Sequence, residues 1–426
     1  MEATAVSRNA TPWFVGGVAA ARYGLQGLLL ILVVPAHNVL SDAWHRSAPW
    51  ADVAAAVLAL LVLVTLLRGG ESPFAALRWP ILLFGLVSLT SVVVNRVPWG
   101  TAAAGLRGIL PWMVLGLSAA AVFRPQHVPG VLRLIRATGI GLAAYGVLSY
   151  LTFRWVGGPF SMPAAGRNLW ESVMLYPYLC GAYPVPAGWR LISTFMNDNY
   201  FGVWLTLLIP IVYAQNLNEE RSWHRLAGHG AVVLMVVACT WTYSRAAALG
   251  LVAGIVVLAA RGHRAALLLL LPVFIAAPLF SFTNDARRFS NVSATQGGRV
   301  QSMQRTLSVL GNSPLLGKGP GTRGLADMNY AKIGYETGAL GLAAFAYLLF
   351  RIIRPVISHR SPSDPRTERL ISGMLAGLIA VAAAGVGGEV WEMPQIAFYF
   401  WLVGGLVLVL TAAQQTARPF SMDQVG

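Results

Sequence analysis

The sequence predicts an all-α polytopic membrane protein with about twelve helices that cross the bilayer. Hydrophobic residues make up 56% of the 426 residues, and charged residues only 11%, against roughly 25% charged in ordinary soluble proteins. The chain also carries 44 Gly and 24 Pro, residues that membrane helices tolerate better than soluble ones. A water-soluble protein of this length would need more polar surface, so that class is disfavoured.

Apolar segments close to the length that crosses roughly 30 Å of hydrocarbon recur along the whole chain. We expect one integral membrane domain over residues 1–426, with spans at 14–35, 51–67, 79–95, 106–123, 130–153, 198–215, 230–243, 246–260, 265–282, 333–353, 370–388 and 395–413. The seventh and eighth segments are either two helices or one broken element.

The basic residues of the short loops predict the orientation, because Lys and Arg favour the cytoplasmic side. With the N-terminus inside, that side receives Arg68, Arg78, Arg124, Arg221, Arg225, Arg261, Arg264, Arg351, Arg354, Arg360, Arg366 and Arg369. The short loops on the other side hold little more than Arg46, Arg96, Arg107 and Arg245. Both termini are therefore expected in the cytoplasm, and the long segments 154–197 and 283–332 outside.

The second long loop, 283–332, is basic although it is expected outside. It holds two acidic residues, Asp285 and Asp327, against the seven basic residues Arg287, Arg288, Arg299, Arg305, Lys318, Arg323 and Lys332. Of the net charge of +15, the part that we expect to matter for function thus lies on this loop. Such a loop is suited to binding an anion, and the alternative is a solvated basic loop without a ligand.

A Gly/Pro-rich turn at Ser313–Gly321 follows a predicted amphipathic helix at 300–311, which places Val300, Met303, Leu307 and Leu310 on one face. Backbone N–H groups of such a turn can form an anion-binding nest, although a turn of this composition is more often a plain loop. It is not a nucleotide-binding P-loop, because Gly follows Lys318 where that motif has Ser or Thr.

An ionisable stretch leads from Asp327 to Glu336 into the predicted tenth span. Ionisable groups at that depth are costly and usually face a cavity, so Asp327 and Glu336 are candidates for proton transfer. The alternatives are a helix cap by Asp327 and a buried structural hydrogen bond by Glu336. Arg190 and Arg245 border the predicted outer face, either to bind an anion or to anchor the chain among headgroups.

Cofactor and nucleic-acid functions find no support in the sequence. Two cysteines, Cys180 and Cys239, make no disulfide framework, and neither CxxC nor HExxH metal spacing occurs. We expect no cofactor and no metal. Nucleic-acid binding is disfavoured because no basic soluble domain stands outside the membrane segments.

In their order along the chain, these pieces resemble the O-antigen ligase/polymerase superfamily of bacterial membrane glycosyltransferases. The resemblance covers roughly 190–345 and rests on Arg190 before Phe195-x-Asn197-x-Asn199, Ser244-Arg245, Gly298-Arg299, the turn Ser313–Gly321, and Glu336-x-Gly338-x-x-Gly341-Leu342. The first five spans match only in hydropathy.

One residue departs from the ligases of the superfamily. Those ligases are expected to carry a catalytic His three residues before the Tyr of the last motif, and here Asp327 stands three residues before Tyr330. No His occurs in 283–332. The chain is therefore more similar to the O-antigen and exopolysaccharide polymerase branch.

The resemblance implies a GT-C-like fold in the bacterial inner membrane and metal-independent transfer of a glycan from undecaprenyl diphosphate to an acceptor hydroxyl at the periplasmic face. Fixed cations would stabilise the leaving diphosphate, and Arg binds phosphate oxygens bidentately. The cations implied are Arg190, Arg245 and Arg299, with Lys318 or Arg323 as helpers. Asp327 is the first candidate for the base, then Glu336, then Glu389 or Glu392.

Several alternatives remain at this point. The partners implied are the lipid-linked donor, a glycan acceptor, membrane lipids and a chain-length regulator. Within the superfamily, a ligase that transfers glycan to lipid A-core or another acceptor is the nearest rival to a polymerase. From another class, a transporter or flippase of lipid-linked glycan would also use outer arginines, but neither inverted repeats nor midplane broken helices stand out. A structural partner in an envelope complex is the weakest alternative.

Overall fold

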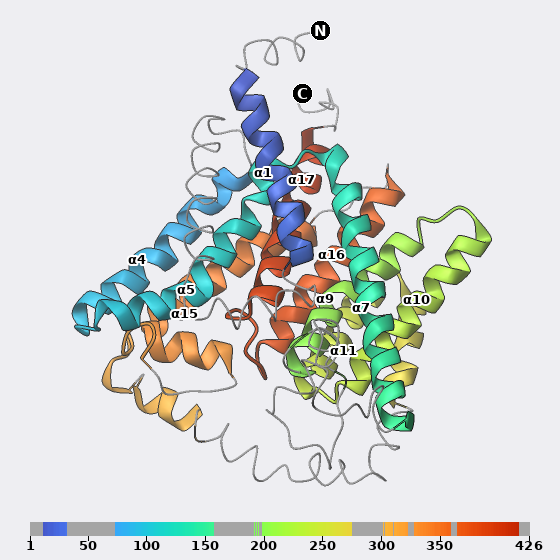
Figure 1. Ribbon diagram of the computed structural model, residues 1–426. Coiled ribbons are helices and arrows are strands. Elements are labelled where there is room, and N and C mark those ends of the chain that lie inside the picture. The colour runs from blue at the N-terminus through green and yellow to red at the C-terminus, as the bar shows by residue number, and fades with distance from the viewer. Residues whose placement is uncertain are drawn as a thin grey trace, which may run out of the picture.

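The computed structural model describes residues 12–31, 73–156, 198–274, 311–322, 328–358 and 364–416, together with positions 191, 193, 195, 301 and 303–309 (Figure 1). Within these residues every regular element is a helix, which confirms the all-α class. Six helices are long and apolar enough to cross a membrane: Ala75–Val94, Trp99–Val122, Pro125–Leu148, Asn329–Ser358, Pro365–Ala384 and Pro394–Gln414. The total of about twelve spans stays a prediction.

The helices follow the predicted apolar segments closely. They are α1 (Pro12–Ile31), η3 (Pro73–Leu77), α4 (Arg78–Val94), α5 (Trp99–Leu117), α6 (Ala119–Val122), η4 (Pro125–His127), α7 (Val128–Val156), α9 (Asp198–Asn216), α10 (Ser222–Trp241), α11 (Arg245–Ala260), η5 (Arg264–Leu270), α15 (Asn329–Ser358), α16 (Pro365–Ala384) and α17 (Pro394–Thr416). The predicted segment 51–67 and residues 275–282 lie outside the described residues.

The seventh and eighth predicted segments are two helices rather than one broken element. A short link at 242–244 separates α10 from α11, and Tyr243 adopts a positive φ of 53° within it. Helix α9 packs against both α10 and α11, whereas these two helices have little contact with each other.

Helix α17 lies at the centre of the bundle, where Figure 1 shows it between α5 and α16. Its side chains from Phe398 to Val403 are fully buried. The approach to α5 is close: a Cβ at Gly116 would lie 2.4 Å from the Cβ of Trp401. Helix α16 approaches α11 in the same way at Gly250, where a Cβ would lie 2.6 Å from the carbonyl oxygen of Ala380. Small residues at such crossings are typical of membrane helix packing.

Two contacts between α4 and α15, which lie side by side, define the two ends of the bundle. Near the start of α15, the Ser91 hydroxyl of α4 donates to the carbonyl oxygen of Glu336 at 3.0 Å. Near its end, the Arg351 guanidinium donates to the carbonyl oxygen of Ala76 at 3.2 Å. At 1.5 Å per residue, the two levels are about 22 Å apart. We call the first level the turn end and the second the arginine end.

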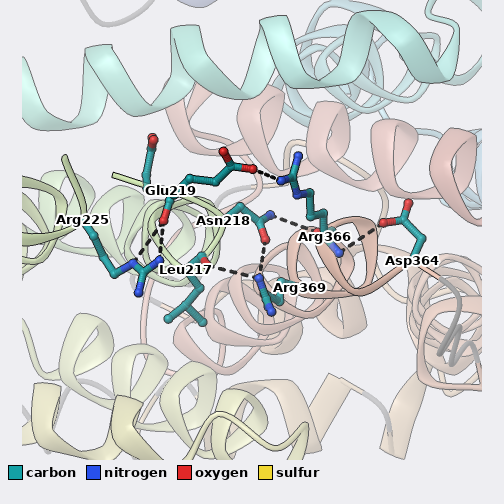
Figure 2. A network of polar contacts seen from close by, with 8 residues as sticks. Leu217, Asn218, Glu219, Arg225, Asp364, Arg366 and Arg369 are labelled. Atoms are coloured by element: carbon teal, nitrogen blue, oxygen red, sulfur yellow. Dashed lines mark hydrogen bonds and ion pairs between the residues drawn. The ribbon is translucent and has the colours of Figure 1, made fainter. Parts of the chain in front are cut away.

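The arginine end carries a network of ion pairs and hydrogen bonds between α9, α10 and α16 (Figure 2). Arg366 pairs with Glu220, and Arg369 donates to the side-chain oxygen of Asn218 at 3.0 Å. Beside this network, Arg261 of α11 donates to Glu368 at 2.8 Å, and its side chain is only 8% exposed. These arginines were predicted to share one membrane side, and they lie at one end; which side that is stays a prediction.

Candidate functional site

The Gly/Pro-rich turn inserts into a break in α15. Gly338 interrupts this helix with a φ of 69° and a ψ of −168°. The N–H groups of Ala339 and Leu340 therefore donate to the carbonyl oxygens of Pro314 and Leu315, at 2.9 and 3.2 Å. In return, the carbonyl oxygens of Tyr335 and Glu336 accept from the N–H groups of Lys318 and Gly319, at 2.9 and 2.7 Å. The exchange satisfies backbone groups that the break would otherwise leave without partners inside a membrane protein.

Glycine is required where the turn meets the helices. The backbone of Gly338 lies in a region that only glycine adopts easily, and a Cβ there would lie 2.3 Å from the carbonyl oxygen of Leu315. On the other side of the turn, a Cβ at Gly105 of α5 would lie 2.2 Å from the backbone nitrogen of Gly321. The turn is therefore held between α5 and α15 by direct backbone contact.

Four N–H groups of the turn are not available for the anion-binding nest that its composition suggests. Those of Lys318 and Gly319 donate to carbonyl oxygens of α15, and that of Gly317 donates to the carbonyl oxygen of Ser313 at 3.1 Å. The N–H of Gly321 donates to the Glu336 carboxylate. These four donors are used inside the protein, so the turn offers an anion fewer backbone donors than its composition suggests.

The predicted amphipathic helix before the turn is present at the described positions 301 and 303–309. It packs on α15 through Thr306, whose hydroxyl donates to the carbonyl oxygen of Ala331 at 3.4 Å, and Val309 is also buried. The apolar side chains of Met303 and Leu307 are exposed on 47% and 58% of their surfaces. The predicted apolar face is thus exposed at its two described positions; Val300 and Leu310 lie outside the described residues.

Glu336 is the most buried carboxylate of the predicted site, with 4% of the residue exposed. Its Oε1 accepts the N–H of Gly321 at 3.1 Å. This contact is the structural hydrogen bond that the sequence left open as an alternative; proton transfer by Glu336 stays a prediction. The polar stretch before Glu336 is itself helical, because α15 begins at Asn329, four residues before the predicted span.

Lys332, one helical turn before Glu336, forms an ion pair with Glu392. Its ammonium lies 2.6 Å from the Glu392 carboxylate, and the two side chains are 24% and 20% exposed. Glu392 belongs to the turn between α16 and α17, and a Cβ at Gly108 of α5 would lie 3.4 Å from its Cγ. The pair therefore ties α15 to the α16–α17 turn beside α5.

The α16–α17 turn is fixed by further contacts. The amide oxygen of the buried Asn329 accepts the N–H groups of Val390 and Trp391, the latter at 3.0 Å. On the same turn, the Glu389 carboxylate lies 3.5 Å from the hydroxyl of Tyr200 on α9. The two carboxylates that the sequence ranks third as bases thus lie on one turn, close to α15.

Arg245 begins α11 beside the same turn. Ser244 caps this helix by accepting the N–H of Ala247 at 3.2 Å, and a Cβ at Gly388 would lie 3.3 Å from the Cβ of Ala246. Lys318 lies on the inserted turn with an exposed side chain. The structure therefore brings the segments of Arg245, Lys318 and Glu336 to one end of the bundle.

The other predicted site residues, Arg190, Arg299, Arg323 and Asp327, lie outside the described residues. The residue after Arg190 is described: the N–H of Leu191 donates to the carbonyl oxygen of Trp241 at 3.0 Å. Trp241 ends α10, four residues before Arg245, so the segments of the first two motifs meet.

Sequence reasoning missed the roles of Lys332, Asn329 and Tyr200. Lys332 entered only as one of seven basic loop residues, although its spacing of four from Glu336 on a helix signals a shared face. Asn329 and Tyr200 carry no local signal, because their partners are distant in the sequence. Among the described residues, no group of three or more His, Cys, Asp or Glu side chains lies close enough to hold a metal ion.

Comparison with known proteins finds a family match over the segment that contains Arg245, Lys318 and Glu336. Residues 230–346 match the family model described as O-Antigen ligase, and they run from α10 past the break in α15. No curated protein matches the chain significantly. The match confirms the resemblance drawn from the motifs: over residues 230–346, the chain is similar to the O-antigen ligase/polymerase superfamily of membrane glycosyltransferases.

Proposed function

We propose that the protein polymerises lipid-linked oligosaccharide repeat units into O-antigen or exopolysaccharide at the periplasmic face of the bacterial inner membrane. In each cycle, a glycan leaves its undecaprenyl diphosphate carrier and joins the next lipid-linked unit. The family match supports a membrane glycosyltransferase of the ligase or polymerase type. Asp327, at the position of the ligase histidine, favours the polymerase.

One observation carries the proposal: a broken helix places a buried carboxylate beside a basic turn within the matched segment. Glu336 accepts the N–H of Gly321, and the segments of Lys318 and Arg245 lie at the same end of the bundle. Irregular backbone at membrane depth is tolerated where it is buried in protein or lines a cavity. A charged group at such a depth marks a functional site more often than a surface charge does.

The reaction places different demands on the cations and the carboxylates. The acceptor oxygen forms a bond to the anomeric carbon and gives its proton to a carboxylate, while the bond from that carbon to the diphosphate oxygen breaks. The charge that develops on the diphosphate is stabilised by fixed cations. We assign this role to Arg245 and Lys318, assisted by Arg190, Arg299 and Arg323.

Asp327 remains our first candidate for the base, since it matches the position of the ligase histidine. The contact of Glu336 with Gly321 supports a positioning role for Glu336, because it holds the turn that carries Lys318. Glu336 stays the second candidate for the base, and Glu389 or Glu392 the third.

A ligase is the second candidate function, and the description of the matched family, O-Antigen ligase, favours it. A ligase would move the glycan onto lipid A-core or another acceptor. Because protein cations are proposed to serve the leaving group, we also propose that neither activity needs a divalent metal, so a chelator should leave the rate unchanged. A chain-length regulator is proposed as a partner of the polymerase.

Reconstitution of the full chain with a synthetic undecaprenyl diphosphate oligosaccharide tests the proposal. Longer lipid-linked products support the polymerase, whereas transfer only to added lipid A-core identifies a ligase. Movement of intact donor across the bilayer, without new glycosidic bonds, identifies a transporter. Asp327→Asn should abolish polymer formation at unchanged protein abundance, and full activity of this variant removes Asp327 as the base.

A further inference from the structure

Three arginines gather on one side of the arginine end without a carboxylate partner among the described residues. Arg351 and Arg354 lie near the end of α15, and Arg78 begins α4. The guanidinium of Arg351 donates to the carbonyl oxygen of Ala76, two residues before Arg78, at 3.2 Å. This contact brings together the ends of the two helices on which the three arginines lie.

Three other arginines of this end pair with carboxylates within the protein. Arg136 and Arg261 pair with Glu219 and Glu368, both at 2.8 Å, and Arg366 pairs with Glu220 (Figure 2). Both groups of arginines lie at the same level of the bundle. Arg261 shows this, because it also donates to the carbonyl oxygen of Ile357, near the end of α15, at 3.2 Å.

Each of the three arginines lies over an exposed aromatic ring. The guanidinium carbon lies 5.5 Å from the ring centre of Trp79 for Arg78, 5.9 Å from that of Tyr347 for Arg351, and 5.5 Å from that of Phe350 for Arg354. The rings are exposed on 67%, 42% and 51% of their surfaces. Arginine over an aromatic side chain keeps its N–H donors at the ring's edge free for a further acceptor.

Two apolar stripes lead away from this cluster toward the turn end. On α4, the exposed side chains are Leu82, Leu86, Leu89 and Val93, which recur at helical spacing. On α15, Leu340, Tyr347 and Phe350 are exposed at the same spacing. Exposed apolar side chains in continuous stripes mark surfaces that contact lipid or a partner rather than water.

We propose that Arg78, Arg351 and Arg354 bind the phosphate of an anionic phospholipid, whose acyl chains lie along the stripes of α4 and α15. A phospholipid matches both parts of this surface, because its anionic headgroup suits the three arginines and its acyl chains suit the apolar stripes. Basic groups between membrane helices at the cytoplasmic boundary are a known form of headgroup site, and the predicted orientation places this end in the cytoplasm. The site is about 22 Å from the level of Glu336, so it is distinct from the glycosyltransferase site.

Binding of dioleoyl phosphatidylglycerol to the purified full chain in neutral detergent tests the proposal, with bound lipids counted by native mass spectrometry. The variant R78Q/R351Q/R354Q should bind this lipid on the order of 100-fold more weakly, from about 1 kcal/mol per arginine. Phosphatidylcholine should bind the two proteins equally. The control R133Q/R221Q/R264Q removes three exposed arginines elsewhere and should bind phosphatidylglycerol like the unaltered protein.

Two outcomes would overturn the proposal. If the first variant binds phosphatidylglycerol as tightly as the unaltered protein, the three arginines do not form a lipid site. If the control variant weakens binding equally, the effect is due to net charge alone. Inorganic phosphate at matched concentration should not displace the lipid, and full displacement would mean that the site binds free phosphate instead. If the triple variant unfolds in a thermal scan, R78Q/R354Q replaces it, because Arg351 then keeps its contact with Ala76.

Discussion

The two ends of the helix bundle hold their charged side chains differently. At the arginine end, three cations that join helices each have an acceptor: Arg261 donates to Glu368, and in the network of Figure 2 Arg366 donates to Glu220 and Arg369 to the amide oxygen of Asn218. At the turn end, the ammonium of Lys332 pairs with Glu392 and is also within electrostatic reach of Glu336 and Glu389. Ion pairs can hold helices together, whereas carboxylates gathered beside a broken helix cost stability unless they serve a function.

This difference predicts that substitutions at the turn end reduce glycan transfer more than folding, and that substitutions at the arginine end do the reverse. The backbone break in α15 is the exception, because it supports both the fold and the site.

The largest effect is expected from Gly338→Ala. The added Cβ would lie 2.3 Å from the carbonyl oxygen of Leu315, at a backbone conformation that alanine does not adopt easily. We expect the turn to leave the helix, with loss of transfer activity and a much lower yield of folded protein in membrane extracts. Gly334→Ala is the matched control, since its Cβ would meet nothing closer than 3.8 Å. A G338A protein as active as G334A would show that the insertion is not needed.

Next in size is the coupling between Lys332 and Glu392, which a double-mutant cycle measures. Each of Lys332→Gln and Glu392→Gln should lower the transfer rate on the order of 10-fold to 100-fold, because the partner is left half-buried and unpaired. The double variant should be little worse than the poorer single one. The exposed Arg366–Glu220 pair, with side chains 66% and 77% exposed, should show almost no coupling in the same assay. Additive losses at Lys332 and Glu392 would contradict a shared role.

At the arginine end, Glu368→Gln should lower the free energy of unfolding by about 2 kcal/mol, because it leaves the buried Arg261 without its carboxylate. Thermal unfolding in detergent measures this loss. The transfer rate per folded molecule should stay within about twofold of the unaltered rate, as expected for a structural pair far from the site. A large drop in that rate at unchanged stability would place function at this end.

The smallest effect concerns His263, between α11 and η5. Burial and the charges of Arg369 and Arg261 lower the pKa of His263, and Glu368 opposes them in part. The folded state therefore disfavours the protonated ring, so stability is complete above the unfolded-state pKa of about 6.5 and falls as the pH drops through the folded-state pKa. The melting temperature should fall by a few degrees between about pH 7.5 and about pH 5.5. His263→Gln should reduce this dependence, and an unchanged dependence would exclude His263 as its source.

The sequence predicted the helices well because the length and composition of each apolar run are enough to indicate a membrane helix. It missed the first turn of α15, where polar Asn329 is buried because it binds the α16–α17 turn some sixty residues away. The break at Gly338 was not expected either, since a glycine within an apolar helix carries no local sign that another segment will insert there.

The candidate site was predicted in part. The motifs placed Arg245, Lys318 and Glu336 in one family pattern, and the structure brings their segments to one end of the bundle. The anion nest is not available at Lys318, Gly319 and Gly321 because the acceptors for these N–H groups belong to α15, which composition does not reveal. The pairing of Lys332 with Glu392 joins residues 60 apart, so no short pattern could predict it.

The contrast between the two ends is tested most directly by one assay on two isosteric variants. Glu336→Gln and Glu368→Gln each replace a carboxylate of α15 or α16 by an amide, and both are reconstituted with undecaprenyl diphosphate oligosaccharide. We predict that E336Q loses at least about 100-fold in transfer rate per folded molecule, whereas E368Q keeps its rate and loses only thermal stability. Equal rates in the two variants, or a greater loss in E368Q, would contradict the assignment of function to the turn end.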